Sequence, residues 1–150
     1  KGSTFTVNTT NESITVLGTQ FNVNSTNDFF EVVCYEGKVG VKTLDSDHIL
    51  LPNATVRKIN GNLSQSSITQ LLEPTWITGE STFKSVPLRY VISALEDQYD
   101  IKFDSEAIDD ATIFSGSFPH ANLNMALKIV FETLHIKYIE KEKRNIKLRY

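Results

Sequence analysis

Few residues of this chain have the types and spacing that chemistry requires. Cys34 is the only cysteine and lies in an apolar run, so we predict a small buried hydrophobic residue rather than a thiolate nucleophile. The histidines, His48, His120 and His135, are far apart and show no zinc-ligand spacing. The glycines form no P-loop and no GxGxxG turn, and the chain has no GxSxG motif. We therefore predict no catalytic residue, no cofactor site and no metal site.

An acidic stretch is the strongest candidate for a metal site. Its members are Asp100, Asp104, Glu106, Asp109 and Asp110. A calcium loop needs a sharp turn, usually at glycine, and no glycine lies between Asp100 and Asp110. We interpret these side chains as solvated carboxylates. Their spacing also permits a glycosidase pair, but nothing selects one pair among the 18 acidic residues.

Composition and charge narrow the classes of function. The chain has 150 residues, 40% of them hydrophobic and 22% charged, which suits one ordinary domain or two small ones. Its net charge of −3 gives no general attraction to nucleic acid or to an anionic membrane. A membrane-spanning helix needs about 20 consecutive apolar residues, and no such run occurs.

Residues 1–75 carry the pattern of an antiparallel β domain. Short alternating runs of β-branched and polar residues are separated by breaks that contain asparagine and glycine. Residues 30–35 and 38–43 look like a hairpin in which Gly37 supplies the positive φ angle. Pro74 disfavours a helix at Glu73, and we place the domain boundary there.

Residues 76–150 instead show helical periodicity. One apolar stripe begins at Leu88, after Pro87, which suits the first turn of a helix. A second stripe begins at Leu123, for which Asn122 is a good N-cap. A strand with a phenylalanine precedes each helix, and an alternating strand follows each one.

The two helical segments are one pattern written twice, with an offset of 35 residues. The first copy is matched at Phe83, Leu88, Val91, Ile92, Leu95, Tyr99, Ile101 and Phe103, and the second at Phe118, Leu123, Ala126, Leu127, Val130, Leu134, Ile136 and Tyr138. We therefore predict an α+β protein. An all-β antiparallel domain, 1–75, precedes a small domain, 76–150, of duplicated βαβ units with two helices on one small sheet.

A last strand over 145–150 is expected to bury Ile146, Leu148 and Tyr150 on one face. Such a strand at the edge of a sheet can accept a strand from a partner. The outward cations Arg144, Lys147 and Arg149 are our predicted partner-binding residues, because they would attract an acidic surface. The alternative is that they only keep the edge soluble.

The motifs of both halves resemble a known family. Residues 16–23 read VLGTQFNV, residues 36–41 read EGKVGV, and Leu50-Leu51-Pro52 follows, a series that resembles the FecR family of sigma-factor regulators. The second half carries WITG at 76–79 and FSGSF at 114–118. It is similar to the C-terminal domain of Bacteroidetes-type FecR proteins, which is itself like the STN (secretin and TonB N-terminal) module. Ser81 and Asn53 depart from the pattern and affect local packing only.

The resemblance implies protein binding in the periplasm, without chemistry. FecR-like proteins are anchored in the inner membrane, and their periplasmic part contacts the signalling domain of a TonB-dependent outer-membrane receptor. The signal controls an ECF (extracytoplasmic-function) sigma factor through a cytoplasmic segment. That segment and the transmembrane helix are not among these 150 residues, and the family's periplasmic region normally begins upstream of Lys1.

Other classes of function make different predictions. A secreted or periplasmic carbohydrate-binding β module with an accessory α+β domain is the alternative, but the chain has a single tryptophan for stacking on sugars. An RNA-binding KH module would need a GxxG loop, which residues 76–150 lack. An exposed strand edge at the amino end predicts a homodimer at high concentration.

Overall fold

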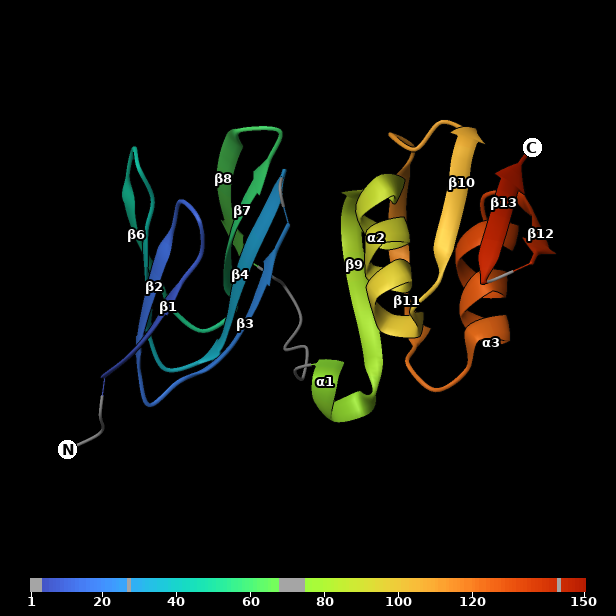
Figure 1. The fold of residues 1–150 in the computed structure, drawn as a ribbon. Helices are drawn as coiled ribbons and strands as arrows, with labels where there is room; N and C mark the ends of the chain where they lie inside the picture. Colours follow the sequence, from blue (N-terminus) through green and yellow to red (C-terminus); the bar gives the residue numbers. More distant parts are fainter. Residues whose placement is uncertain (1–3, 27, 68–74, 143) are drawn as a thin grey trace. The chain divides into compact units, whose positions relative to one another are not determined.

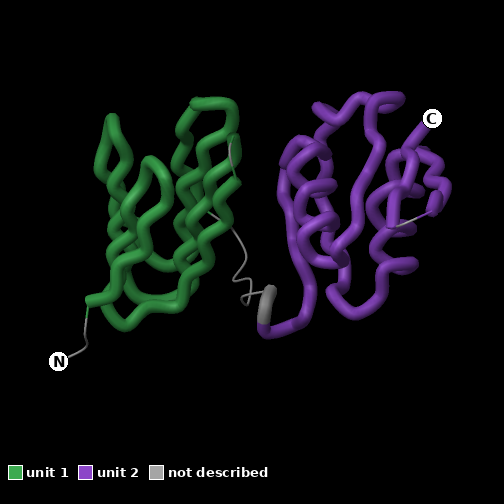
Figure 2. Tube along the Cα trace, viewed as in Figure 1, with its two compact units in different colours: residues 1–74 green, residues 75–150 purple. Residues whose placement is uncertain are grey.

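The structure, a computed structural model, describes residues 4–26, 28–67, 75–142 and 144–150. The chain divides into two compact units, residues 1–74 and 75–150 (Figure 2). Glu73 and Pro74, where the sequence placed a boundary, lie outside the described residues. Each unit has a core of its own and is described by itself.

Unit 1 is a sandwich of two antiparallel four-stranded sheets (Figure 1). The first sheet has the order β1-β2-β5-β6 and the second β3-β4-β7-β8. Each sheet is made of two hairpins that come from different parts of the sequence. The strands are β1 (Thr4–Asn8), β2 (Ser13–Leu17), β3 (Gln20–Ser25), β4 (Phe29–Glu36), β5 (Val39–Lys42), β6 (Asp47–Leu50), β7 (Ala54–Ile59) and β8 (Asn62–Ser67).

The core of unit 1 lies between the two sheets, because alternate residues of the strands point inward. Both sheets contribute apolar side chains to one cluster, made of Ile14, Val16, Phe30, Val32, Cys34, Val39, Val41, Leu50 and Val56. Cys34 is fully buried there, which confirms the prediction of a small buried hydrophobic residue. β1, at an edge of the first sheet, carries Phe5, which is 59% exposed.

The predicted hairpin around Gly37 is wrong. β4 pairs with β3 and β7, whereas β5 pairs with β2 and β6, so the chain changes sheets at Gly37. The residue has the expected positive φ of 82°. A Cβ at Gly37 would lie 2.6 Å from the methyl group of Thr19. The VLGT and EGKV motifs therefore pack together at a crossing between the sheets.

Unit 2 contains the strand–helix–strand order twice. The first copy is β9 (Glu80–Pro87), α2 (Leu88–Tyr99) and β10 (Lys102–Ala107). The second copy is β11 (Ile113–Pro119), α3 (Leu123–Leu127) with a π-helical continuation η1 (Lys128–Glu132), and β12 (Lys137–Lys141). A short helix α1 (Thr75–Thr78) precedes the first copy, and β13 (Asn145–Arg149) follows the second. The chain is thus α+β and mostly β.

The two helices do not lie on one small sheet, as the sequence suggested. β9 and β11 form a two-stranded sheet, and β10, β13 and β12 form a second sheet in that order. α2 contacts β9 and β11 on one side and β10 on the other, and η1 contacts β11 and β12 (Figure 1). The helices therefore lie between two sheets, and the strands of each copy are divided between them. Spacing along the chain could not reveal which strands pair.

The repeat extends to the ends of the helices. Asp100 and His135, which are related by the 35-residue offset, both have left-handed backbones, with φ angles of 53° and 57°. The next residue in each copy returns to the last helical turn: Ile101 N–H donates to the Glu96 carbonyl at 3.3 Å, and Ile136 N–H to the Phe131 carbonyl at 2.9 Å. This six-to-one hydrogen bond is the Schellman motif.

The helix beginnings differ from each other. Asn122 caps α3, since its side chain accepts a hydrogen bond from Met125 N–H at 2.9 Å, as predicted. Pro87 has a ψ of 137° and ends β9, so the prediction that it forms part of the first helical turn is wrong.

The last strand is central, not at an edge. β13 pairs in parallel with β10 and antiparallel with β12. Ile146 and Leu148 are buried as predicted, whereas Tyr150 is 59% exposed. Because both edges of β13 are already hydrogen-bonded, it cannot accept a strand from a partner, and that prediction is wrong.

Candidate functional site

The thiol and three members of the acidic stretch have partners within the fold. Burial raises the pKa of Cys34, and its sulfur lies 3.6 Å from the Glu36 carbonyl oxygen. Asp100 and Asp104 pair with separate cations, and the Asp109 carboxylate accepts a hydrogen bond from the Ala111 N–H. Among the described residues, no group of three or more His, Cys, Asp or Glu side chains is arranged to hold a metal ion.

One histidine does have partners that the sequence did not reveal. His48 on β6 lies 2.8 Å (Nε2) from Ser46 Oγ and 2.9 Å (Nδ1) from Gln65 Oε1 on β8. The Gln65 amide oxygen accepts from Nδ1, and in the other contact either the Ser46 hydroxyl or Nε2 can be the donor. The order matches a nucleophile, a base and an orienting group. However, the third member is a neutral amide, which supplies no charge to stabilise an imidazolium.

The Ser46–His48–Gln65 group links edge strands of the two sheets, since β6 ends the first sheet and β8 the second. A similar pair occurs in unit 2, where Ser81 Oγ lies 2.8 Å from His120 Nε2. Both groups connect neighbouring segments of the fold. The Ser46–His48–Gln65 group therefore links the two sheets of unit 1 by side-chain hydrogen bonds.

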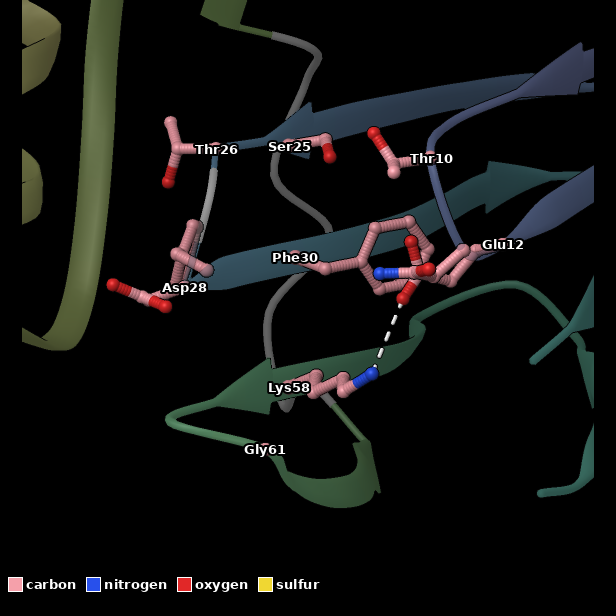
Figure 3. Close-up of a pocket in the computed structure, with 10 residues that line it drawn as sticks. Thr10, Glu12, Ser25, Thr26, Asp28, Phe30, Lys58 and Gly61 are labelled. Atoms are coloured by element: carbon pink, nitrogen blue, oxygen red, sulfur yellow. Dashed lines mark hydrogen bonds and ion pairs between the residues drawn. The ribbon is translucent and has the colours of Figure 1, made fainter. Parts of the chain in front are cut away.

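A polar cavity of about 410 Å³ opens at one end of unit 1 (Figure 3). Hydroxyl side chains of Thr10, Ser25 and Thr26 line it, and Glu12 forms an ion pair with Lys58 at 3.3 Å. The Glu12 side chain is only 7% exposed, so the lysine compensates a largely buried charge. The aromatic rings at this cavity, Phe29 and Phe30, are buried and offer no platform on which a sugar could stack.

The three predicted partner-binding residues lie on and beside β13. Lys147 and Arg149 are on the outer face of the sheet, and Lys147 Nζ contacts Asp104 Oδ2 at 3.2 Å. Arg144 occupies the turn before β13 and pairs with Asp100 through two exposed side chains. The structure thus brings Lys147 and Arg149 onto one surface and places Arg144 at its end.

Further cations share the face of Lys147 and Arg149. Strand register puts Lys102 and Lys141 beside Asn145, and Lys137 beside Arg149. We call this surface the basic face and define it by Lys102, Lys137, Lys141, Lys147 and Arg149. Lys102, Lys137 and Lys141 were not predicted as partner-binding residues, although the alternation 137, 139, 141 along one strand was a usable signal.

Lysines of the basic face hold the pKa of Asp104 below its ordinary value. It is lowered first by the hydrogen bond from Lys147, and further by the charges of Lys147 and Lys141. Cations on two neighbouring strands therefore act on the same carboxylate.

No helix in the described part of the chain could cross a bilayer. The longest, α2, has 12 residues and Glu96 and Asp97 near its end. An α-helix that spans a membrane needs about 20 residues.

Comparison with known families gives two matches in separate units. The family described as "FecR protein" matches residues 1–40, and the one described as "FecR, C-terminal" matches residues 80–148. No curated protein matches the chain. The matched ranges contain VLGTQFNV, FSGSF and all but the last residue of EGKVGV, whereas Leu50-Leu51-Pro52 and WITG at 76–79 lie outside them.

Comparison with solved structures gives the same answer. Two crystal structures of a candidate anti-sigma factor from Parabacteroides distasonis ATCC 8503, at 1.65 and 2.50 Å resolution, match with TM-scores of 0.82 and 0.83. Each is 28% identical in sequence, and the match covers 97% of this chain and 70% of the other. Family and fold agree in both units, and the chain belongs to the FecR family of regulators.

Proposed function

We propose that the chain is the periplasmic signal-relay region of a FecR-type anti-sigma factor. In this role it binds the N-terminal signalling domain of a TonB-dependent outer-membrane transducer, and the bound state controls an ECF sigma factor. The observation that carries the proposal is the agreement of fold over 97% of the chain with a candidate anti-sigma factor. Contact with the sigma factor belongs to the family's cytoplasmic segment, and not to these residues.

The architecture of unit 2 supports a domain like STN. Two strand–helix–strand copies, with matched helix ends at Asp100 and His135, are what duplication of one element would leave. His48 links two strands, Asp109 stabilises a turn and Asp100 forms an ion pair. FecR-type regulators act by binding, and the side chains of both units fit that role.

Titration calorimetry tests this function directly. The purified chain is titrated with the signalling domain of the transducer encoded beside its gene. We expect saturable binding with one partner for each chain. The signalling domain of an unrelated transducer is the control and should give no binding at the same concentrations. Absence of binding to the cognate domain would contradict the proposal.

A further inference from the structure

The outer face of the sheet β10-β13-β12 is a grid of cations. Its first row runs from Lys102 through Asn145 to Lys141, and its last row includes Arg149 beside Lys137. Neighbouring strands lie about 4.8 Å apart, and alternate residues along a strand about 6.8 Å apart. All five cations therefore lie within one continuous surface.

The middle row differs from the other two. Asp104, Lys147 and Ile139 lie side by side across the three strands. Ile139 is 40% exposed, although it lies between two lysines of its own strand. The centre of the face thus offers one carboxylate, one ammonium group and one apolar side chain.

The chain itself neutralises only part of this charge. Lys147 pairs with Asp104, and Lys102 pairs with Glu96 at 3.4 Å. Within the described residues, no ion pair includes Lys137, Lys141 or Arg149. Three cations therefore remain for a partner, and two of them lie on β12.

The composition of the face favours a protein partner over a phosphate surface. Asp104 would repel phosphates, and Ile139 would gain nothing from them. A protein can place carboxylates opposite the lysines, a donor opposite Asp104 and an apolar side chain on Ile139. The net charge of −3 also gives the chain no long-range attraction to a polyanion.

We infer that the basic face docks an acidic protein surface, with Lys137 and Lys141 as its principal unneutralised charges and Ile139 as its apolar centre. The inference rests on the proposed function and identifies that acidic surface as part of the transducer's signalling domain. It replaces strand addition at β13 with contact across a sheet face.

A pair of charge reversals tests the inference. Lys137→Glu with Lys141→Glu changes two exposed residues, four positions apart, on β12. Lys38→Glu with Lys42→Glu is the matched control, with the same spacing and exposure in unit 1. Each double variant takes the net charge from −3 to −7, because each replaces two positive charges by two negative ones. Any effect of net charge alone is therefore equal in both.

The measurement is the association rate with the signalling domain by surface plasmon resonance, after circular dichroism has verified folding. We expect the β12 variant to associate about tenfold or more slowly at low salt, and the control within about twofold of the unaltered chain. The deficit should shrink at 0.5 M salt, where charges more than a few ångströms apart are screened.

The outcomes separate the inference from the function. If the unaltered chain does not bind the domain, the proposed function fails. If the unaltered chain binds and the two double variants associate at equal rates, the proposed function stands. In that case the basic face is not the docking surface. Tighter binding of the unaltered chain to phosphatidylglycerol vesicles or to a short DNA duplex at the same salt would overturn the assignment to a protein.

Discussion

The two copies in unit 2 share a backbone plan but differ in their helices. The first copy has the regular 12-residue helix α2, whereas the second has five residues of α-helix followed by five of π-helix. Both helices are followed by a residue with a left-handed backbone, Asp100 or His135, and by the same six-to-one hydrogen bond. The C-terminal end of the helix is thus common to the two copies, whereas its beginning and its middle are not.

Side-chain chemistry explains the difference. Positions 94–96 of α2 are Ala-Leu-Glu, which favour a regular helix, whereas the equivalent positions 129–131 are Ile-Val-Phe, which favour it less. Thr133 Oγ1 donates to the Ile129 carbonyl at 2.7 Å and competes with the backbone hydrogen bonds. The second helix is therefore wound more loosely.

The contact between the helix and the strand that follows it is polar in the first copy and aromatic in the second. In the first copy, the Glu96 carboxylate accepts a hydrogen bond from Phe103 N–H at 2.8 Å. At the equivalent positions of the second copy, the rings of Phe131 and Tyr138 have their centroids 6.3 Å apart. One scaffold therefore tolerates a polar or an aromatic contact. Lys102 forms an ion pair with Glu96, whereas its counterpart Lys137 has Phe131 at the position equivalent to Glu96.

Equal substitutions at equivalent positions should have unequal costs. Leu88 is fully buried, whereas Leu123 is partly exposed beside a cavity. We expect Leu88→Ala to lower the free energy of unfolding by about 2–5 kcal/mol and Leu123→Ala by about 1 kcal/mol or less. Urea unfolding of each variant measures the difference. Equal losses would mean that the copies bury their helices alike.

The paired strands β9 and β11 differ at one repeat position, where Ser81 corresponds to Gly116. A Cβ at Gly116 would lie 2.8 Å from the ring of Phe114, which is buried. Gly116→Ser should therefore cost about 1–3 kcal/mol of stability through overpacking. Ser81→Gly should cost less, since it removes one hydrogen bond to His120 worth about 1 kcal/mol. Thermal unfolding that ranks the two in the reverse order would contradict the packing at Gly116.

The two left-handed helix ends offer a gain of stability. His135→Gly should raise the free energy of unfolding by up to about 1 kcal/mol, because glycine adopts a positive φ without strain. Asp100→Gly should gain less, because it also removes the exposed ion pair with Arg144. Chemical denaturation compares them. A loss of stability for His135→Gly would show that its side chain has a role beyond the turn.

The smallest effect concerns pH. The folded-state pKa of Asp104 is below its ordinary value of 3.8, so its contribution to stability is present above that pH and is lost as pH falls through the folded pKa. Asp104→Asn should remove this contribution. The second copy has Ile139 at the equivalent position, which does not titrate. The stability of wild type and variant should therefore differ more at pH 7 than at pH 2. A constant difference would show that Lys147 does not stabilise the carboxylate.

The sequence predicted strand residues and backbone conformation better than it predicted which strands pair with each other. Alternation identified Ile14, Val16, Val39 and Val41 as strand residues, and all four are buried. The positive φ at Gly37 was also correct. The partner of its strand was not, because a positive φ suits both a hairpin turn and a crossing between sheets. The deciding contact is with Thr19, on a different loop.

Only part of the basic face could be predicted from the sequence. Lys147 and Arg149 were expected to point away from Ile146 and Leu148, and the strand does bury those two residues. Their neighbours Lys102, Lys137 and Lys141 depend on register between strands, which alternation within one strand does not specify. The pairing of β13 with β10 joins segments far apart in the sequence. The sequence therefore suggested that β13 is an edge strand, whereas it is the central strand of its sheet.

Zero-length cross-linking would locate the contact between the basic face and the signalling domain. A carbodiimide joins a lysine to a carboxylate only where the two groups touch, so mass spectrometry of the cross-linked chain and signalling domain reads the interface residue by residue. We predict cross-links from Lys137, Lys141 and Lys147 to aspartate or glutamate residues of the partner. Cross-links confined to Lys38, Lys42 or Lys58 of unit 1 would show that the basic face is not the interface.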